Sequence, residues 1–142
     1  MGGTGVGWLK QLLWLWGPPL AWMGLIFFLS AQPDLPHAPE PWLDTLLRKG
    51  THACVFGVLA WLYLRGLRGH FRTGGVLRVL SVILAVAYAA SDEYHQTFVP
   101  GRHGAPFDVG VDAVGICAAM LLDWWLAHRR ALLRQAQPPV AR

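Results

Sequence analysis

The chain has little charge for its length, and this shortage excludes most soluble folds. Only 14% of its 142 residues are charged, whereas 54% are hydrophobic. Soluble domains carry about 25% charged residues on average. The composition therefore indicates a small integral membrane protein.

The chain also has few cysteines. Cys54 and Cys117 both lie inside apolar runs, without a Cys-x-x-Cys pair or a nearby ligand pattern. A His-Glu-x-x-His zinc motif is absent as well. These absences argue against a disulfide framework or a familiar zinc site. We expect both cysteines to be small, buried, apolar residues.

No internal repeat and no long linker divides the chain. We therefore expect one membrane domain over residues 1–134 and a flexible cytoplasmic tail over residues 135–142. A proline-rich segment predicts an extended, partly rigid loop from Ser30 to about Leu47. Four glycines predict a flexible loop within residues 66–75.

Four hydrophobic stretches supply candidate membrane helices: Leu12 to Leu29, Thr51 to Leu64, Val76 to Ala90 and Val109 to Leu126. A helix needs about 20 mostly apolar residues to cross a bilayer. The first and fourth stretches qualify alone. The second stretch reaches that length only if it starts at Trp42, and the third only if it continues to Val99. Both extensions include charged residues. We predict an all-α integral membrane bundle of four transmembrane helices, with those charges at or just inside the membrane boundary.

The first stretch has an alternative interpretation as a secretory signal peptide. Lys10 precedes it, and Leu29-Ser30-Ala31 resembles a cleavage site. However, the apolar run exceeds the usual length of about 7–15 residues, and Gly17-Pro18-Pro19 interrupts it. We expect a retained helix that the two prolines kink.

The basic residues are divided unequally between the two sides of such a bundle. The side with the termini and the second loop holds nine: Lys10, Arg65, Arg68, Arg72, Arg78, Arg129, Arg130, Arg134 and Arg142. The other side holds Arg48, Lys49 and Arg102. Because cytoplasmic loops carry an excess of Lys and Arg, this division predicts that both termini are cytoplasmic. The expected partner is the lipid bilayer, and nothing points to nucleic acid.

Ionisable residues gather where the last three stretches approach one side of the membrane. Charge inside a membrane is costly and by default indicates function. Helical spacing places the polar residues of each stretch along one stripe. We expect three helix ends to form one polar site from these residues: Lys49, His52, Asp92, Glu93, His95, Gln96, Arg102, Asp108 and Asp112.

Several of these residues also have a purely structural explanation. Lys49 could reach the lipid headgroups, and His52 could bond to a neighbouring helix. Asp108 could interact with the positive N-terminus of its own helix. Gly101 could form a turn, and Arg102 could be a salt-bridge partner.

Asp112 resists such an explanation better, because it lies a full turn deeper than Asp108. Asp92 and Glu93 are adjacent and point in different directions around a helix. At most one of these two carboxylates is therefore expected to face a shared site.

The order of these residues resembles the VanZ-like family of small bacterial membrane proteins. The family pattern has Lys-x-x-His, then Asp-Glu-x-His-Gln-x-Phe-x-Pro-Gly-Arg, then Asp-x-x-x-(Asn or Asp)-x-x-Gly. The chain supplies all three parts, as Lys49 and His52, as residues 92–102, and as Asp108, Asp112 and Gly115. The segment Phe28-Leu29-Ser30-Ala31-Gln32-Pro33 also resembles the end of the family's first helix.

This resemblance implies a multi-pass protein of the bacterial inner membrane. The family takes its name from a protein associated with resistance to the glycopeptide antibiotic teicoplanin, and its members have no settled biochemical activity. The chain departs from the family at Phe56, where many members have tyrosine, and at Val55, where some have glutamate.

Two functions are compatible with this pattern. The first is binding or modulating a cell-envelope lipid or an antibiotic-related ligand, with Lys49 and Arg102 contacting phosphate. The second is a metal-assisted enzyme for a lipid-linked cell-wall substrate, with these candidate ligands or acid–base groups: Asp92, His95, Asp108 and Asp112. An ion-pair network that only joins the helices is a third explanation. The sequence specifies neither a cofactor nor an oligomeric state.

Overall fold

The computed structural model describes residues 4–33, 39–72, 74–102 and 104–136. Four helices and no strand occur in these segments: α1 (Thr4–Ser30), α2 (Pro41–Arg68), α3 (Gly74–Gln96) and α4 (Pro106–Gln135). The prediction of an all-α, four-helix chain is confirmed. The tail beyond Ala136 lies outside the described residues.

Three of the helices are long and apolar enough to cross a membrane: α1 from Gly7 onward, α3 and α4. α3 is long enough without the predicted extension to Val99, because it runs from Gly74 to Gln96 and so exceeds the predicted stretch at both ends. α2 is 28 residues long but less apolar, since charged residues flank its centre. It begins at Pro41, so the loop after α1 is shorter than predicted, and proline suits the first helical position because it has no N–H to satisfy.

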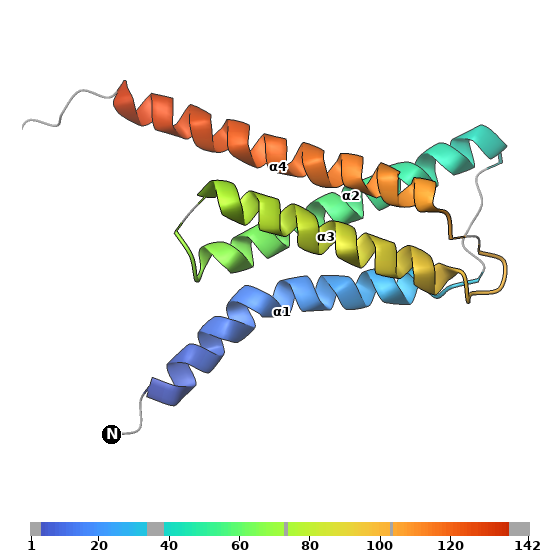
Figure 1. Cartoon of the computed structure of the whole chain (residues 1–142), viewed down its shortest axis with the longest axis horizontal. Helices are drawn as coiled ribbons and strands as arrows, with labels where there is room; N and C mark the ends of the chain where they lie inside the picture. Colours follow the sequence, from blue (N-terminus) through green and yellow to red (C-terminus); the bar gives the residue numbers. More distant parts are fainter. Residues whose placement is uncertain (1–3, 34–38, 73, 103, 137–142) are drawn as a thin grey trace, which may run out of the picture.

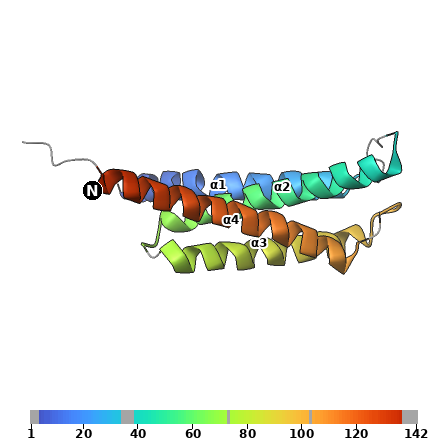
Figure 2. The same ribbon diagram turned by 90° about the horizontal axis from the view of Figure 1, so that it is seen from above.

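Consecutive helices run antiparallel, so the first turn of α1, the last turn of α4 and the α2–α3 connection share one end of the bundle (Figure 1). We call this the arginine-rich end; its side chains include Arg65, Arg68, Arg72, Arg78, Arg129, Arg130 and Arg134. The opposite end, called the site end, holds the last turns of α1 and α3 and the first turns of α2 and α4. Seen from above, α1 and α3 lie on opposite sides of the bundle, and α2 crosses beneath α4 (Figure 2).

The closest helix pair is α2 and α4, which approach through small residues. A Cβ added at Gly115 would collide with the backbone carbonyl of Ala53, and one added at Gly57 would lie 3.0 Å from the Gly115 carbonyl oxygen. Small residues four positions apart let membrane helices pack closely. This approach brings the first turns of α2 and α4 together at the site end.

The bundle has a narrow core and a broad apolar surface. Fully buried side chains include Phe56, Leu59, Leu64 and Ile116. Many large apolar side chains face outward, as expected where the surrounding solvent is lipid. Cys54 and Cys117 are also exposed, so the prediction that they are buried is wrong.

At the arginine-rich end, one carboxylate joins three helices. Asp123 on α4 accepts two bonds from Arg68 on α2, at 2.8 and 2.7 Å, and one from Arg78 on α3 at 2.9 Å. The two-pronged arginine contact is the strong form of this interaction. It fixes the helix ends farthest from the candidate site.

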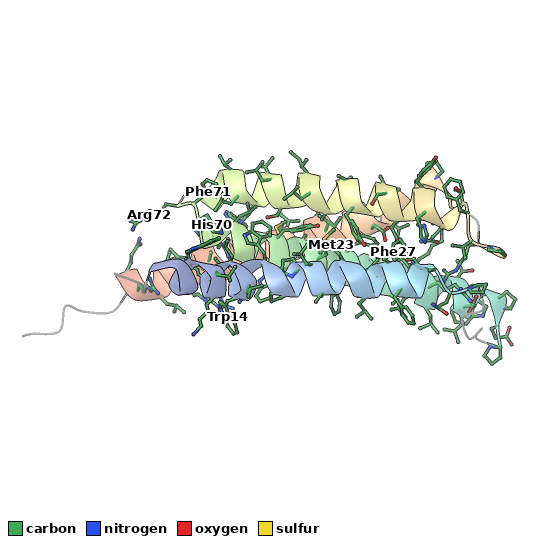
Figure 3. All side chains as sticks on the ribbon, turned by 90° about the horizontal axis from the view of Figure 1, so that it is seen from below. Trp14, Met23, Phe27, His70, Phe71 and Arg72 are labelled. Carbon is green, nitrogen blue, oxygen red and sulfur yellow. The ribbon has the colours of Figure 1, made fainter. Side chains whose placement is uncertain are left out.

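α1 lies at the edge of the bundle and bends along its length (Figure 1). Pro18 and Pro19 lie inside the helix, where each removes a backbone bond, so the predicted kink has a cause. Beyond the bend, Met23 and Phe27 lie on the side of α1 that faces the other helices (Figure 3). Tyr63 and Tyr88 both donate hydrogen bonds to Met23, to its sulfur and to its carbonyl oxygen respectively.

Candidate functional site

A polar cavity of about 290 Å³ lies at the site end between α2, α3, α4 and the α3–α4 loop. Seven of the nine predicted site residues line it: Lys49, His52, Glu93, Gln96, Arg102, Asp108 and Asp112. Thr45, Arg48, Gly101 and Val111 complete the lining. The three helix ends therefore meet as the spacing of the polar residues predicts.

His52 and Asp112 face each other at the inner wall of this cavity. The His52 Nδ1 atom lies 3.7 Å from Asp112 Oδ1. Asp112 is 0% exposed, and neither of its oxygens has a hydrogen-bond partner among the described residues. The same holds for His52 Nδ1. Burying a carboxylate without hydrogen bonds costs much free energy unless a positive charge lies beside it.

Glu93 on α3 brings a second carboxylate to the same place. Its Oε2 atom accepts a hydrogen bond of 2.9 Å from the backbone N–H of Ala105, directly before α4 begins. An anion is favourable at a helix N-terminus. A Cβ at Gly104 would collide with the Glu93 carbonyl, so glycine lets the loop lie against α3. One ligand atom each from His52, Glu93 and Asp112 lies within 4.8 Å of the others.

Cationic groups form the rim of the cavity. Lys49 binds Asp108 at 2.7 Å, and its ammonium lies 4.7 Å from the centre of the Phe107 ring. Arg48 pairs with Asp44 at 2.7 Å, one helical turn earlier. Both pairs are partly exposed, so their partners can exchange at low cost.

Arg102 links the α3–α4 loop to α1. Residues 99–102 form a type II turn, in which Arg102 N bonds to Val99 O at 3.1 Å and Gly101 has a φ of 79°. The Arg102 side chain donates to Gln32 O at 3.1 Å and to Leu29 O at 3.2 Å. A cation is favourable there, at the C-terminus of α1. Partial burial and nearby Arg48 lower the pKa of Arg102, yet a guanidinium stays charged at neutral pH.

Asp92 and His95 point toward α1 and do not line the polar cavity. Asp92 Oδ2 accepts bonds from Ser30 Oγ at 2.8 Å and from Gln96 Nε2 at 3.0 Å, while its Oδ1 is buried without a partner among the described residues. The His95 ring stacks on Phe27 with 4.4 Å between centroids. Of the four metal-ligand candidates from the sequence, only Asp112 belongs to the convergent group with His52 and Glu93.

A second cavity, of about 420 Å³, lies between α1 and α2. Its walls are mainly apolar and include Trp22, Leu25, Ile26, Leu29, Leu47 and Val55. We call it the apolar groove. It shares three lining residues with the polar cavity, namely Arg48, His52 and Arg102. This groove could not be predicted from the sequence, because its walls have the same composition as a lipid-facing surface.

A protein-family model for VanZ/LLP1 matches residues 15–127. The chain belongs to the VanZ/LLP1 family. The matched range includes every residue that lines the polar cavity and the apolar groove. No curated protein and no solved structure matches the chain.

The two residues that depart from the pattern noted in the sequence, Phe56 and Val55, lie beside the polar cavity and the apolar groove. Phe56 is fully buried, with its ring 6.1 Å from the His52 ring and 6.2 Å from the Tyr88 ring. Val55 lines the apolar groove, and its carbonyl accepts a bond of 2.9 Å from Trp22 Nε1. At these two positions this chain presents apolar surface where a phenol or a carboxylate would introduce a polar group.

Proposed function

We propose that this VanZ/LLP1 membrane protein binds an anionic cell-envelope lipid at its site end. The headgroup occupies the polar cavity, and a hydrocarbon chain follows the apolar groove. The observation that carries the proposal is that the two cavities share Arg48, His52 and Arg102. A polar site that continues into an apolar groove fits an amphipathic ligand.

A phosphate is the headgroup that this rim fits best. Arg48, Lys49 and Arg102 contribute three cations around the polar cavity. A guanidinium has five N–H donors, and the bonds of Arg102 to Leu29 O and Gln32 O use its Nη2 and Nε atoms. Further donors therefore remain for charge-assisted bonds to phosphate oxygens. Lys49 would exchange its partly exposed contact with Asp108 for the ligand.

The unequal distribution of basic residues supports an extracytoplasmic site. Nine of the twelve Lys and Arg residues belong to the side with the termini and the α2–α3 loop, and such an excess favours the cytoplasm. In the inner membrane of a bacterium, the site end would then reach the outer leaflet. Binding a lipid there would alter the surface that a glycopeptide such as teicoplanin meets.

A metal-assisted enzyme is the second candidate function. The observation that favours it is the convergence of His52, Glu93 and Asp112 beside the polar cavity. A bound cation in that position could polarise a phosphoryl oxygen of a lipid-linked substrate. Turnover of a phospholipid or an isoprenoid diphosphate by purified protein, abolished by a chelator, would favour this function over binding alone.

The binding proposal is tested by the lipids that accompany the purified protein. Leu25→Trp fills the apolar groove from α1 without removing a charge, since Leu25 is a lining residue that is 44% exposed. Leu121→Trp is the matched control, because Leu121 is 64% exposed and lines neither cavity. After extraction, mass spectrometry should find an anionic lipid retained by the wild type and by Leu121→Trp, and at least tenfold less in Leu25→Trp. Equal lipid in all three proteins would reject the proposal.

A further inference from the structure

We infer that His52, Glu93 and Asp112 form a binding site for a divalent cation at the inner wall of the polar cavity. Each residue comes from a different helix, α2, α3 and α4 respectively. One imidazole and two carboxylates are suitable ligands for a first-row cation such as Zn²⁺ or Mn²⁺. The cation would join the three helices and present an open coordination position to the cavity.

The arrangement of the three ligands is close to that of a site with a bound cation. The three candidate ligand atoms lie within 4.8 Å of one another, and His52 Nδ1 is 3.7 Å from Asp112 Oδ1. Neighbouring ligands of a tetrahedral cation with bonds of about 2.1 Å are about 3.4 Å apart. Side-chain shifts of about 1 Å or less would therefore complete the coordination.

A second observation points independently to a missing cation. Asp112 is fully buried, and both of its oxygens lack a hydrogen-bond partner among the described residues. Two of the rim cations are engaged elsewhere, since Lys49 pairs with Asp108 and Arg102 bonds to carbonyls at and just beyond the end of α1. A protonated His52 at 3.7 Å would supply one charge opposite two carboxylates. A divalent cation would neutralise the charge of both carboxylates. It would also coordinate an Asp112 oxygen that otherwise lacks a partner among the described residues.

The surroundings hold the ligands in place, as the outer contacts of metal sites do. The bond from Ala105 N fixes one oxygen of Glu93 and leaves the other oxygen available. The contact of Gly115 with Ala53 sets the separation of α2 and α4 close to the ligands, since Ala53 follows His52 and Gly115 lies about one turn after Asp112. The Phe56 ring packs beside the His52 imidazole.

If the proposed lipid binds, the cation would contact an oxygen of its phosphate. This part of the inference rests on the proposed function. The cation site itself does not, because its three ligands are protein side chains. The two claims are therefore measured separately, with metal binding tested without added lipid.

The test uses the full chain purified in detergent, stripped with a chelator and titrated with Zn²⁺, Mn²⁺ or Mg²⁺ alone. We expect about one Zn²⁺ or Mn²⁺ per chain by elemental analysis, together with a higher melting temperature after metal addition. Asp112→Asn, which keeps the side-chain shape, should lower the affinity at least 100-fold. Asp92→Asn is the matched control, because Asp92 is equally buried but faces α1, and it should keep wild-type affinity.

Two results would overturn the inference. One is a wild-type protein that none of the three cations binds or stabilises, which needs no variant and so no assumption about variant folding. The other is Asp112→Asn protein, monodisperse and helical, that binds the metal as tightly as wild type. Loss of metal binding in Asp92→Asn but not in Asp112→Asn would place the site against α1 instead.

Discussion

Gly115 of α4 lies against the backbone of Ala53 of α2, so closely that a Cβ at residue 115 would collide with the Ala53 carbonyl. Asp112 lies about one helical turn before Gly115, and His52 directly precedes Ala53. The two side chains face each other across the same two helices. The separation of these ionisable groups therefore depends on a contact between small residues in the membrane.

Replacing Gly115 by leucine should separate α2 from α4. The larger side chain has no space, and overpacking typically costs about 1–3 kcal/mol. The melting temperature in detergent should fall, and Zn²⁺ should no longer raise it. Gly110→Leu is the control, since a Cβ at Gly110 meets nothing within 4 Å; equal melting temperatures for the two variants would contradict the packing argument.

Replacing Arg102 should release α1 from the loop before α4. Arg102→Lys keeps the charge but loses the planar fork that bonds to Leu29 O and Gln32 O. Hydrogen exchange in the last two turns of α1 should become at least tenfold faster in this variant. Arg134→Lys, an exposed arginine at the other end of the bundle, should leave it unchanged. Unchanged exchange in Arg102→Lys would show that the guanidinium is not the anchor.

Removing the Ser30 hydroxyl should destabilise the pairing of α1 with α3. Ser30 Oγ donates to Asp92 Oδ2 in a buried environment, and a hydrogen bond to a charged group contributes about 1.5–3 kcal/mol. Ser30→Ala should lower the free energy of unfolding by about 2 kcal/mol. Ser91→Ala, which removes an exposed hydroxyl bonded to Tyr88 O on its own helix, should change it by less than about 0.5 kcal/mol.

The Ser30 effect should also depend on Asp92. In an Asp92→Asn background, Ser30→Ala should cost measurably less than in the wild type, because directly bonded partners are not additive. Additive losses in the double variant would mean that the two side chains do not interact in the membrane.

The orientation of the bundle can be measured with single cysteines. In a background without Cys54 and Cys117, Glu40→Cys at the site end and Arg72→Cys at the arginine-rich end both replace exposed residues. A membrane-impermeant thiol reagent added to intact bacterial cells should label only Glu40→Cys. Labelling of Arg72→Cys alone would reverse the orientation and place the site in the cytoplasm.

Much of the fold is predictable because polar residues in an apolar chain have few acceptable positions. The spacing of Lys49 with His52 and of Asp108 with Asp112 placed them on helix stripes, and the structure brings them to one cavity. Adjacent Asp92 and Glu93 diverge as helical geometry requires, with only Glu93 lining that cavity.

Other features could not be predicted from this sequence because lipid and protein core are both apolar. Cys54 and Cys117 therefore gave no sign of facing outward. The apolar groove depends on how α1 packs against α2, and no local sequence pattern predicts that packing. Arg102 bonds to backbone carbonyls at and just beyond the end of α1. A search for residues of opposite charge does not find such acceptors, because every residue has a carbonyl.

The site end is proposed to hold one amphipathic ligand and one divalent cation. Native mass spectrometry of the chain, released gently from detergent without prior chelation, would detect both at once. We expect a species carrying one anionic lipid and one divalent cation, with the lipid lost in Leu25→Trp and the cation lost in Asp112→Asn. A wild-type spectrum with only the bare chain would contradict the claim and leave the polar residues as a network that joins the helices.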